Sequence, residues 1–128
     1  DFLFPNKNVL PNFELSVRKA VQSLSGEKNP FENWFQALEF MKKEISQKDF
    51  DIALIGCGAY GFPLAAHTKK IGKQSIHIGG SLQILFGIKG ARWNNHPIIS
   101  KFYNEHWVRP RAKDKPSKSH LVENDCYW

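Results

Sequence analysis

The sequence has few of the features that mark several classes of protein. Its two cysteines, Cys57 and Cys126, are too few for a disulfide framework, which favours a reducing compartment and a cytoplasmic protein. No run of about 18 apolar residues is present, so we expect no membrane-spanning segment. The N-terminus lacks the charged and then apolar pattern of a secretory signal. No helix-turn-helix, zinc-finger or RNP pattern occurs, and nucleic acid is therefore not an expected partner.

The length of the chain bounds its organisation. A chain of 128 residues is long enough for one domain and too short for two. Apolar residues make up 41% of the chain, which permits a packed core. Because the chain begins with Asp1 rather than methionine, we interpret it as a processed product or as the C-terminal portion of a longer protein.

Positive charge exceeds negative charge, with a formal net charge of +6. Much of the excess lies after residue 88, where the basic residues are Lys89, Arg92, Lys101, Arg109, Arg111, Lys113, Lys115 and Lys118. A segment of this kind attracts phosphates or acidic surfaces. An ordinary solvated surface explains the same residues equally well.

The hydrophobic pattern predicts an irregular lead-in over residues 1–12, followed by alternating strands and helices. Residues 13–24 fit both a helical stripe and the alternation of a strand, and we favour a strand of about six residues there. Asn29 and Pro30 suit the start of a helix over 30–47, along which apolar residues recur at three- and four-residue spacing.

The next residues predict a strand–helix–strand unit. The strand over 51–55 is short, apolar and typical of a parallel sheet. The helix over 61–71 ends at Gly72, and the second strand covers 74–78. We further expect a short helix over 81–86, a helix over 97–107 and an irregular tail over 110–128, whose terminal aromatic residues either dock or remain disordered. The predicted fold class is α/β, a single Rossmann-like three-layer domain with a mostly parallel sheet and an irregular C-terminal tail.

The turn between the first strand and its helix has the spacing G-x-G-x-x-G, at Gly56, Gly58 and Gly61. Glycines there allow the backbone to approach a ligand closely, and the helix N-terminus favours a phosphate. Tyr60 lies within the turn, and we expect it to cover a ligand. A turn that only packs tightly is the structural alternative.

A second pair of glycines, Gly79 and Gly80, ends the neighbouring strand and should line the same crevice, with Gln83 within reach of a ligand. A dinucleotide site expects an acidic residue at the end of this strand to hold a ribose. Residues 76–80 read IHIGG and contain none. This absence weakens the alternative function, a Rossmann-type oxidoreductase or a regulatory nucleotide-binding module.

Four segments together resemble the C-terminal part of bacterial surface-polysaccharide biosynthesis proteins that are associated with the glycosyltransferase D-type fold, a Rossmann-like class. The resemblance covers roughly residues 30–128. Its motifs are residues 51–66 (DIALIGCGAYGFPLAA), 79–93 (GGSLQILFGIKGARW), 103–110 (YNEHWVRP) and 126–128 (CYW).

The resemblance implies transfer of a sugar from a nucleotide diphosphate donor to an acceptor saccharide. Members of that class carry an acidic metal-binding motif in their N-terminal half, so a divalent metal would be bound by residues outside this chain. The chain would then be either inactive alone or a domain of a larger enzyme. A transferase also needs positive charge beside the leaving diphosphate and a base beside the acceptor hydroxyl. Lys89 and Arg92 are our candidates for the charge, and Glu105 is our candidate for the base. No metal ligand is predicted within the chain.

Overall fold

The computed structural model describes residues 2–23 and 28–128, which fall into two compact units. The first unit contains residues 2–18 and 83–128, and the second contains residues 19–23 and 28–82. The chain combines helices with a two-stranded parallel sheet, as expected for the α/β class. The single domain expected from the chain length stays a prediction.

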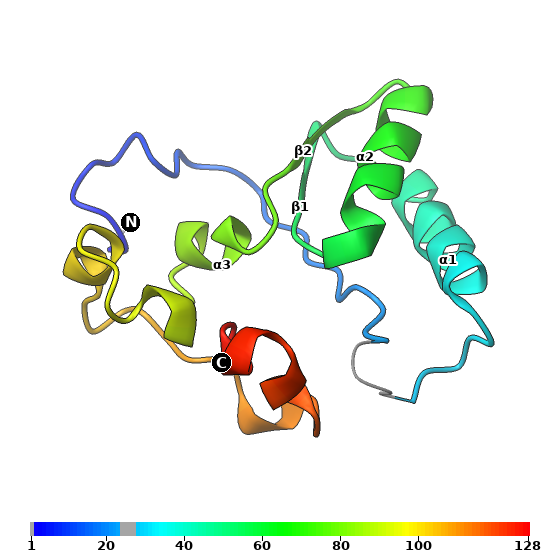
Figure 1. The fold of residues 1–128 in the computed structure, drawn as a ribbon. Coiled ribbons are helices and arrows are strands. Elements are labelled where there is room, and N and C mark those ends of the chain that lie inside the picture. Colours follow the sequence, from blue (N-terminus) through cyan, green and yellow to red (C-terminus); the bar gives the residue numbers. More distant parts are fainter. Residues whose placement is uncertain (1, 24–27) are drawn as a thin grey trace. The chain divides into compact units, whose positions relative to one another are not determined.

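The second unit is built around a strand–helix–strand motif (Figure 1). Strand β1 (Ile52–Ile55) leads through the glycine turn into helix α2 (Gly61–Lys70), and strand β2 (Gln74–His77) returns beside β1. The strands are parallel, with Ile52 opposite Gln74 and Ile55 opposite His77. These elements confirm the predicted strands and helix, and Gly72, with a φ of 80°, follows the end of α2.

Helix α1 (Trp34–Ser46) is shorter than the helix predicted over 30–47. Its cap is Asn33, whose side chain accepts a hydrogen bond from the Gln36 N–H at 3.1 Å. The Gln36 side chain in turn accepts from the Glu32 N–H at 3.1 Å. Asn29, the predicted cap, accepts instead from the Phe31 N–H at 3.0 Å. The prediction was wrong by one turn because a second asparagine competes successfully for the helix start.

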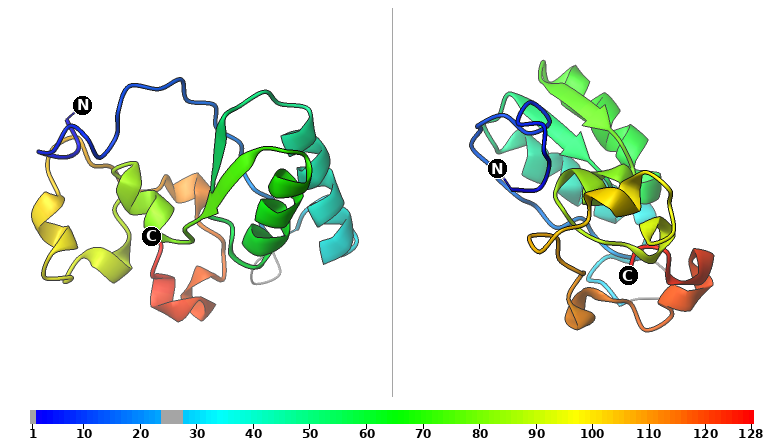
Figure 2. Two further views of the ribbon diagram at one scale, coloured as in Figure 1. Left: turned by 90° about the horizontal axis from the view of Figure 1, so that it is seen from above. Right: turned by 90° about the vertical axis from the view of Figure 1, so that its left-hand side faces the viewer.

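The core of the second unit lies where α1, α2 and β1 meet (Figure 2). Its buried residues are Ala37, Leu38, Met41, Ile55, Tyr60 and Leu64. A large apolar side chain of this kind contributes about 1.5–3 kcal/mol when fully buried. Of the apolar stripe read from the sequence of α1, Leu38 and Met41 are therefore buried, whereas Phe35 is 71% exposed.

Residues 13–23 form neither the predicted strand nor a helix, and residue 24 lies outside the described residues. Phe13, Leu15 and Val17 are 51–69% exposed. The alternating pattern was misleading because no neighbouring strand among the described residues pairs with this segment.

The first unit contains little regular structure. Helix α3 (Ser81–Leu85) begins at the end of the second unit, as expected for this segment, and a parallel bridge joins Ile88 to Val108. Trp107 is one of the buried residues of this unit, with the rings of Phe4 and Tyr103 5.6 and 5.0 Å away. The remaining helical turns are short and of the 3-10 type: Gly58–Tyr60 in the second unit, and Ala91–Trp93, Ile99–Phe102, Ala112–Asp114, Ser119–Leu121 and Glu123–Asp125 in the first.

The helix predicted over 97–107 is wrong, since only Ile99–Phe102 is helical. Two side chains redirect the backbone. His96 Nδ1 accepts hydrogen bonds from the Ile98 and Ile99 N–H groups, and Asn104 Oδ1 accepts from the His106 N–H. Such local bonds compete with helical ones.

The C-terminal tail is irregular, as predicted, and its last residues are docked on the first unit. The Ala91 N–H donates to the Trp128 carbonyl at 3.1 Å, and the Arg92 N–H donates to the Cys126 carbonyl at 3.0 Å. Cys126 is 5% exposed. Of the two expectations for the terminal aromatic residues, docking is therefore confirmed.

Candidate functional site

The two glycine turns lie against each other in the second unit. A Cβ added at Gly56 would lie 2.7 Å from the Gly79 carbonyl oxygen and 2.9 Å from Leu82 Cβ. Only glycine fits this contact. The structure thus brings the turn after β1 and the turn after β2 to the same edge of the sheet, as the sequence predicted.

Gly58 and Gly79 face open space. Their φ angles are 54° and 55°, and a Cβ added at either residue would meet nothing within 4 Å. The left-handed conformation explains why glycine is favoured at both positions. Gly58 is exposed and opens the 3-10 turn that runs directly into α2. The Tyr60 and Gly61 N–H groups of this turn donate to the Cys57 and Gly58 carbonyls.

Gly61 has a different role, which is close packing between helix and strand. A Cβ at this residue would lie 2.1 Å from His77 Cε1. The His77 ring is held in place by a hydrogen bond that its Nδ1 donates to the Ile55 carbonyl at 3.1 Å. His77 is therefore a packing residue of β2.

Tyr60, which we expected to cover a ligand, points into the core instead. It is 5% exposed and stacks on Trp34, with ring centroids 5.3 Å apart and planes 8° from parallel. Its hydroxyl lies 3.1 Å from the Ser23 hydroxyl oxygen. The Tyr60 N–H donates to the Cys57 carbonyl at 3.2 Å, so neither this side chain nor this N–H group is available to a ligand.

Cys57 lies inside the turn without nucleophilic character. Burial raises the pKa of its thiol, so the thiol stays protonated at neutral pH. Cys126 behaves similarly: burial raises its pKa, although the charge of Arg92 acts in the opposite direction.

The other predicted site residues, Gln83, Lys89, Arg92 and Glu105, belong to the first unit. Gln83 Nε2 donates to the Tyr127 carbonyl at 3.1 Å, and its Oε1 is buried without a partner among the described residues. Gln83 therefore helps to hold the tail, and one of its polar atoms remains unsatisfied.

Arg92 is engaged by the tail. Its guanidinium forms an ion pair with Glu123 and lies over the Tyr127 ring, 5.0 Å from the centroid. A diphosphate at this residue would have to displace Glu123. Lys89, in contrast, lies over the Tyr103 ring at 5.4 Å and has no carboxylate partner among the described residues.

Glu105, the predicted base, is solvent exposed. Its side chain is 87% exposed and lies 3.6 Å from His106 Nε2. The pairing of adjacent residues, which a helix would prevent, is possible because this segment is a turn. Arg109, four residues further along the chain, donates to Asn94 Oδ1 at 2.8 Å.

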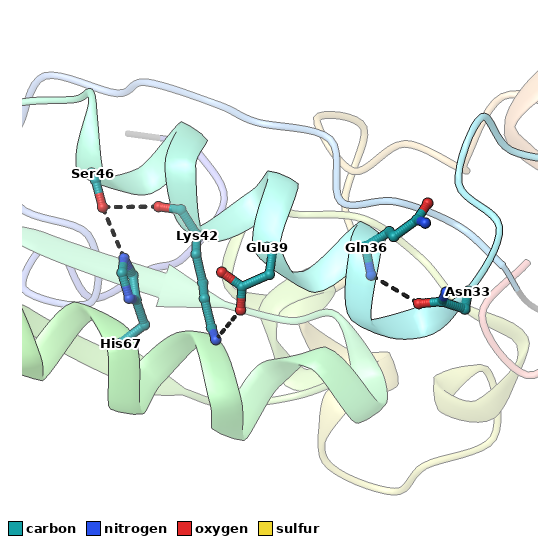
Figure 3. A network of polar contacts seen from close by, with 6 residues as sticks. All are labelled: Asn33, Gln36, Glu39, Lys42, Ser46 and His67. Carbon is teal, nitrogen blue, oxygen red and sulfur yellow. Dashed lines mark hydrogen bonds and ion pairs between the residues drawn. The ribbon is translucent and has the colours of Figure 1, made fainter.

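A serine–histidine contact joins α1 and α2 and has no signal in the sequence (Figure 3). Ser46 Oγ lies 2.8 Å from His67 Nε2, and the same hydroxyl donates to the Lys42 carbonyl at 3.0 Å. The single hydroxyl proton is thus used, so His67 must be the donor to Ser46. A histidine that donates to a serine does not activate it as a nucleophile, and we interpret the pair as a link between helices.

Two further features bear on the choice of site. A surface depression of about 550 Å³ on the second unit contains none of the predicted site residues. It is lined by Phe62, Ala65, Ala66, Lys69, Lys73, Gln74 and Ser75.

Among the described residues, no group of three or more His, Cys, Asp or Glu side chains is placed to hold a metal ion. No helix among these residues is long and apolar enough to cross a membrane.

Comparisons with protein-family models, curated proteins and solved structures gave no significant match. The sequence motifs and the geometry of the glycine turns are therefore the features that bear on function.

Proposed function

We propose that the chain is a nucleotide-sugar-dependent glycosyltransferase domain of polysaccharide biosynthesis, with the donor diphosphate bound at the glycine turn. The observation that carries this proposal is the geometry of Gly58. Its backbone has a left-handed conformation, faces open space and directly precedes α2. Exposed N–H groups and the positive end of a helix dipole together favour a phosphate.

The end of β2 supports a transferase over an oxidoreductase. A dinucleotide site requires an acidic side chain there, and the chain has His77 followed by Ile78 and two glycines. His77 is already used in packing against Gly61. The alternative, a Rossmann-type oxidoreductase or regulatory nucleotide-binding module, retains the support of the G-x-G-x-x-G spacing.

The proposed function also includes the fold, the location and the acceptor. The two-stranded sheet would be part of a Rossmann-like three-layer fold, and the protein would act in the cytoplasm on an acceptor saccharide. A catalytic metal would be held by residues outside this chain. The roles implied by the resemblance, Lys89 as a charge for the leaving diphosphate and Glu105 as the base, stay predictions.

Thermal unfolding with added nucleotides tests this function. UDP or GDP should stabilise the chain, by about 2.7 kcal/mol at 100 times the dissociation constant, whereas NAD and NADP should not. Gly58→Val should abolish this stabilisation because a β-branched side chain is disfavoured at the left-handed φ and would project into the space assigned to the phosphate.

Gly72→Val is the matched control. Gly72 also has a positive φ and open space around it, but it follows the C-terminus of α2. Both variants therefore carry similar backbone strain, and only Gly58→Val should lose the nucleotide effect. Stabilisation that survives in both variants would place the nucleotide elsewhere. Stabilisation by NAD alone would favour the oxidoreductase, and no response to any nucleotide would favour a turn that only packs.

A further inference from the structure

Two basic side chains of the first unit are brought together by the Ile88–Val108 bridge. The Lys89 N–H donates to the Val108 carbonyl at 2.7 Å, and the Val108 N–H donates to the Gly87 carbonyl at 2.9 Å. The bridge is parallel, so Lys89 and Arg109 each follow one of its two partners. Because side chains alternate along extended backbone, both leave the bridge on the same side.

Tyr103 lies beside Lys89, and its hydroxyl is within electrostatic range of Arg109. Lys89 Nζ is 5.4 Å from the centre of its ring. Burial raises the pKa of the Tyr103 hydroxyl, and the charge of Arg109 is close enough to act against that rise. The hydroxyl oxygen is buried and has no hydrogen-bond partner among the described residues. A buried donor without an acceptor is uncommon in proteins and calls for an explanation, such as an absent ligand or water.

The two cations differ from most of their basic neighbours in lacking an anionic partner. Arg92, Arg111 and Lys115 form ion pairs with Glu123, Asp114 and Asp125. Arg109 bonds only a neutral amide oxygen, that of Asn94, and Lys89 contacts only the Tyr103 ring, as far as the described residues show. Like charges held near one another repel, and an anion between them removes that repulsion.

We propose that Lys89, Tyr103 and Arg109 form a binding site for a phosphoryl anion of about diphosphate size, in addition to the glycine turn. Arginine offers a planar set of donors that matches phosphate oxygens, and lysine supplies a compact charge. The Tyr103 hydroxyl supplies a third donor once the flexible cationic side chains close around an anion. The site goes beyond the proposed glycosyl transfer and does not depend on it, because none of its residues belongs to the glycine turn.

Calorimetric titration of the full chain with inorganic pyrophosphate at low ionic strength tests the site. Arg109→Gln and Lys89→Gln should each weaken binding at least tenfold. Lys101→Gln is the matched control, since Lys101 is exposed on Ile99–Phe102 and its loss changes the net charge equally. The affinity of Lys101→Gln for pyrophosphate should stay within twofold of that of the unmodified chain. Tyr103→Phe retains the ring beneath Lys89 and should weaken binding through the lost hydroxyl alone.

Gly58→Val separates this site from the glycine turn. It should remove only binding at the turn, and the pyrophosphate binding that depends on Arg109 should remain. Absence of pyrophosphate binding to the unmodified chain would overturn the proposal. So would a loss of affinity in Lys101→Gln as large as that in Arg109→Gln. The third contrary result is pyrophosphate binding that is abolished by Gly58→Val and retained in Arg109→Gln. Titration with UDP then identifies the source of the anion. The same dependence on Arg109 would indicate a nucleotide diphosphate, and binding of pyrophosphate alone would indicate a free diphosphate.

Discussion

Gly61 illustrates how one residue position can be fixed by a single neighbour. An added Cβ would lie 2.1 Å from the His77 ring, which is itself held by the Ile55 carbonyl. We expect Gly61→Ala to destabilise the second unit by about 1–3 kcal/mol, the usual cost of overpacking, in urea unfolding.

The same substitution in a His77→Ala background provides the control. With the ring removed, alanine should be neutral or stabilising at Gly61, because it favours a helix over glycine by about 1 kcal/mol. An equal cost in both backgrounds would show that the His77 contact is not the reason for glycine at this position.

For single residues, the sequence predicted backbone conformation better than it predicted where side chains point. The spacing of Gly56, Gly58 and Gly61 located a turn whose glycines the structure shows to be required. It did not reveal that Tyr60 would turn into the core or that Arg92 would pair with Glu123, since both depend on partners distant in sequence. Arg109 was missed as a companion of Lys89 for the same reason.

Among the elements, the turn Glu123–Asp125 is the one with the least favourable backbone. All three of its residues have positive φ angles, between 44° and 63°. Asp125 holds the turn in place by accepting a hydrogen bond from the Ser119 hydroxyl and by pairing with Lys115 at 3.1 Å. These two partners, Ser119 first, lower the pKa of the Asp125 carboxyl.

This lowered pKa gives the turn a defined dependence on pH. The stabilisation by Asp125 is fully present above the unfolded pKa of about 4 and is lost as the pH falls through the lower folded value. Asp125→Asn keeps the tolerance for a left-handed backbone but removes the charge. It should lower the melting temperature at pH 7 and have progressively less effect below pH 4. A difference that is constant over this range would exclude the charge as the cause.

The strand–helix–strand unit was predicted correctly from residues close together in the sequence, and two other segments were not predicted correctly. Strand β1, helix α2 and strand β2 were predictable because their apolar runs and glycine punctuation are local, and consecutive elements of this kind pair readily. The failures at 13–23 and 97–107 have opposite causes. The first segment has an apolar pattern but no partner strand among the described residues, and the second has helical spacing that His96 and Asn104 override.

For the whole molecule, the division into two units implies that damage to one need not spread to the other. The buried residues of the first unit include Trp107, Ser119 and Cys126, whereas the core of the second is formed by α1, β1, α2 and the turn before it. The last three residues belong to the first unit. Their carbonyls accept hydrogen bonds from the Ala91 and Arg92 N–H groups and from Gln83.

Deletion of residues 126–128 should therefore loosen only the first unit. It removes those three acceptors, each bond contributing about 0.5–1.5 kcal/mol, together with the ring beneath Arg92. Hydrogen exchange followed by mass spectrometry should show faster exchange over residues 83–93 and unchanged protection in α1, β1 and α2. Tyr127→Leu, which retains the backbone bonds and loses only the ring, should have a much smaller effect. Faster exchange throughout residues 34–77 would mean that the two units unfold together, because a local loss of hydrogen bonds spreads only through a shared cooperative unit.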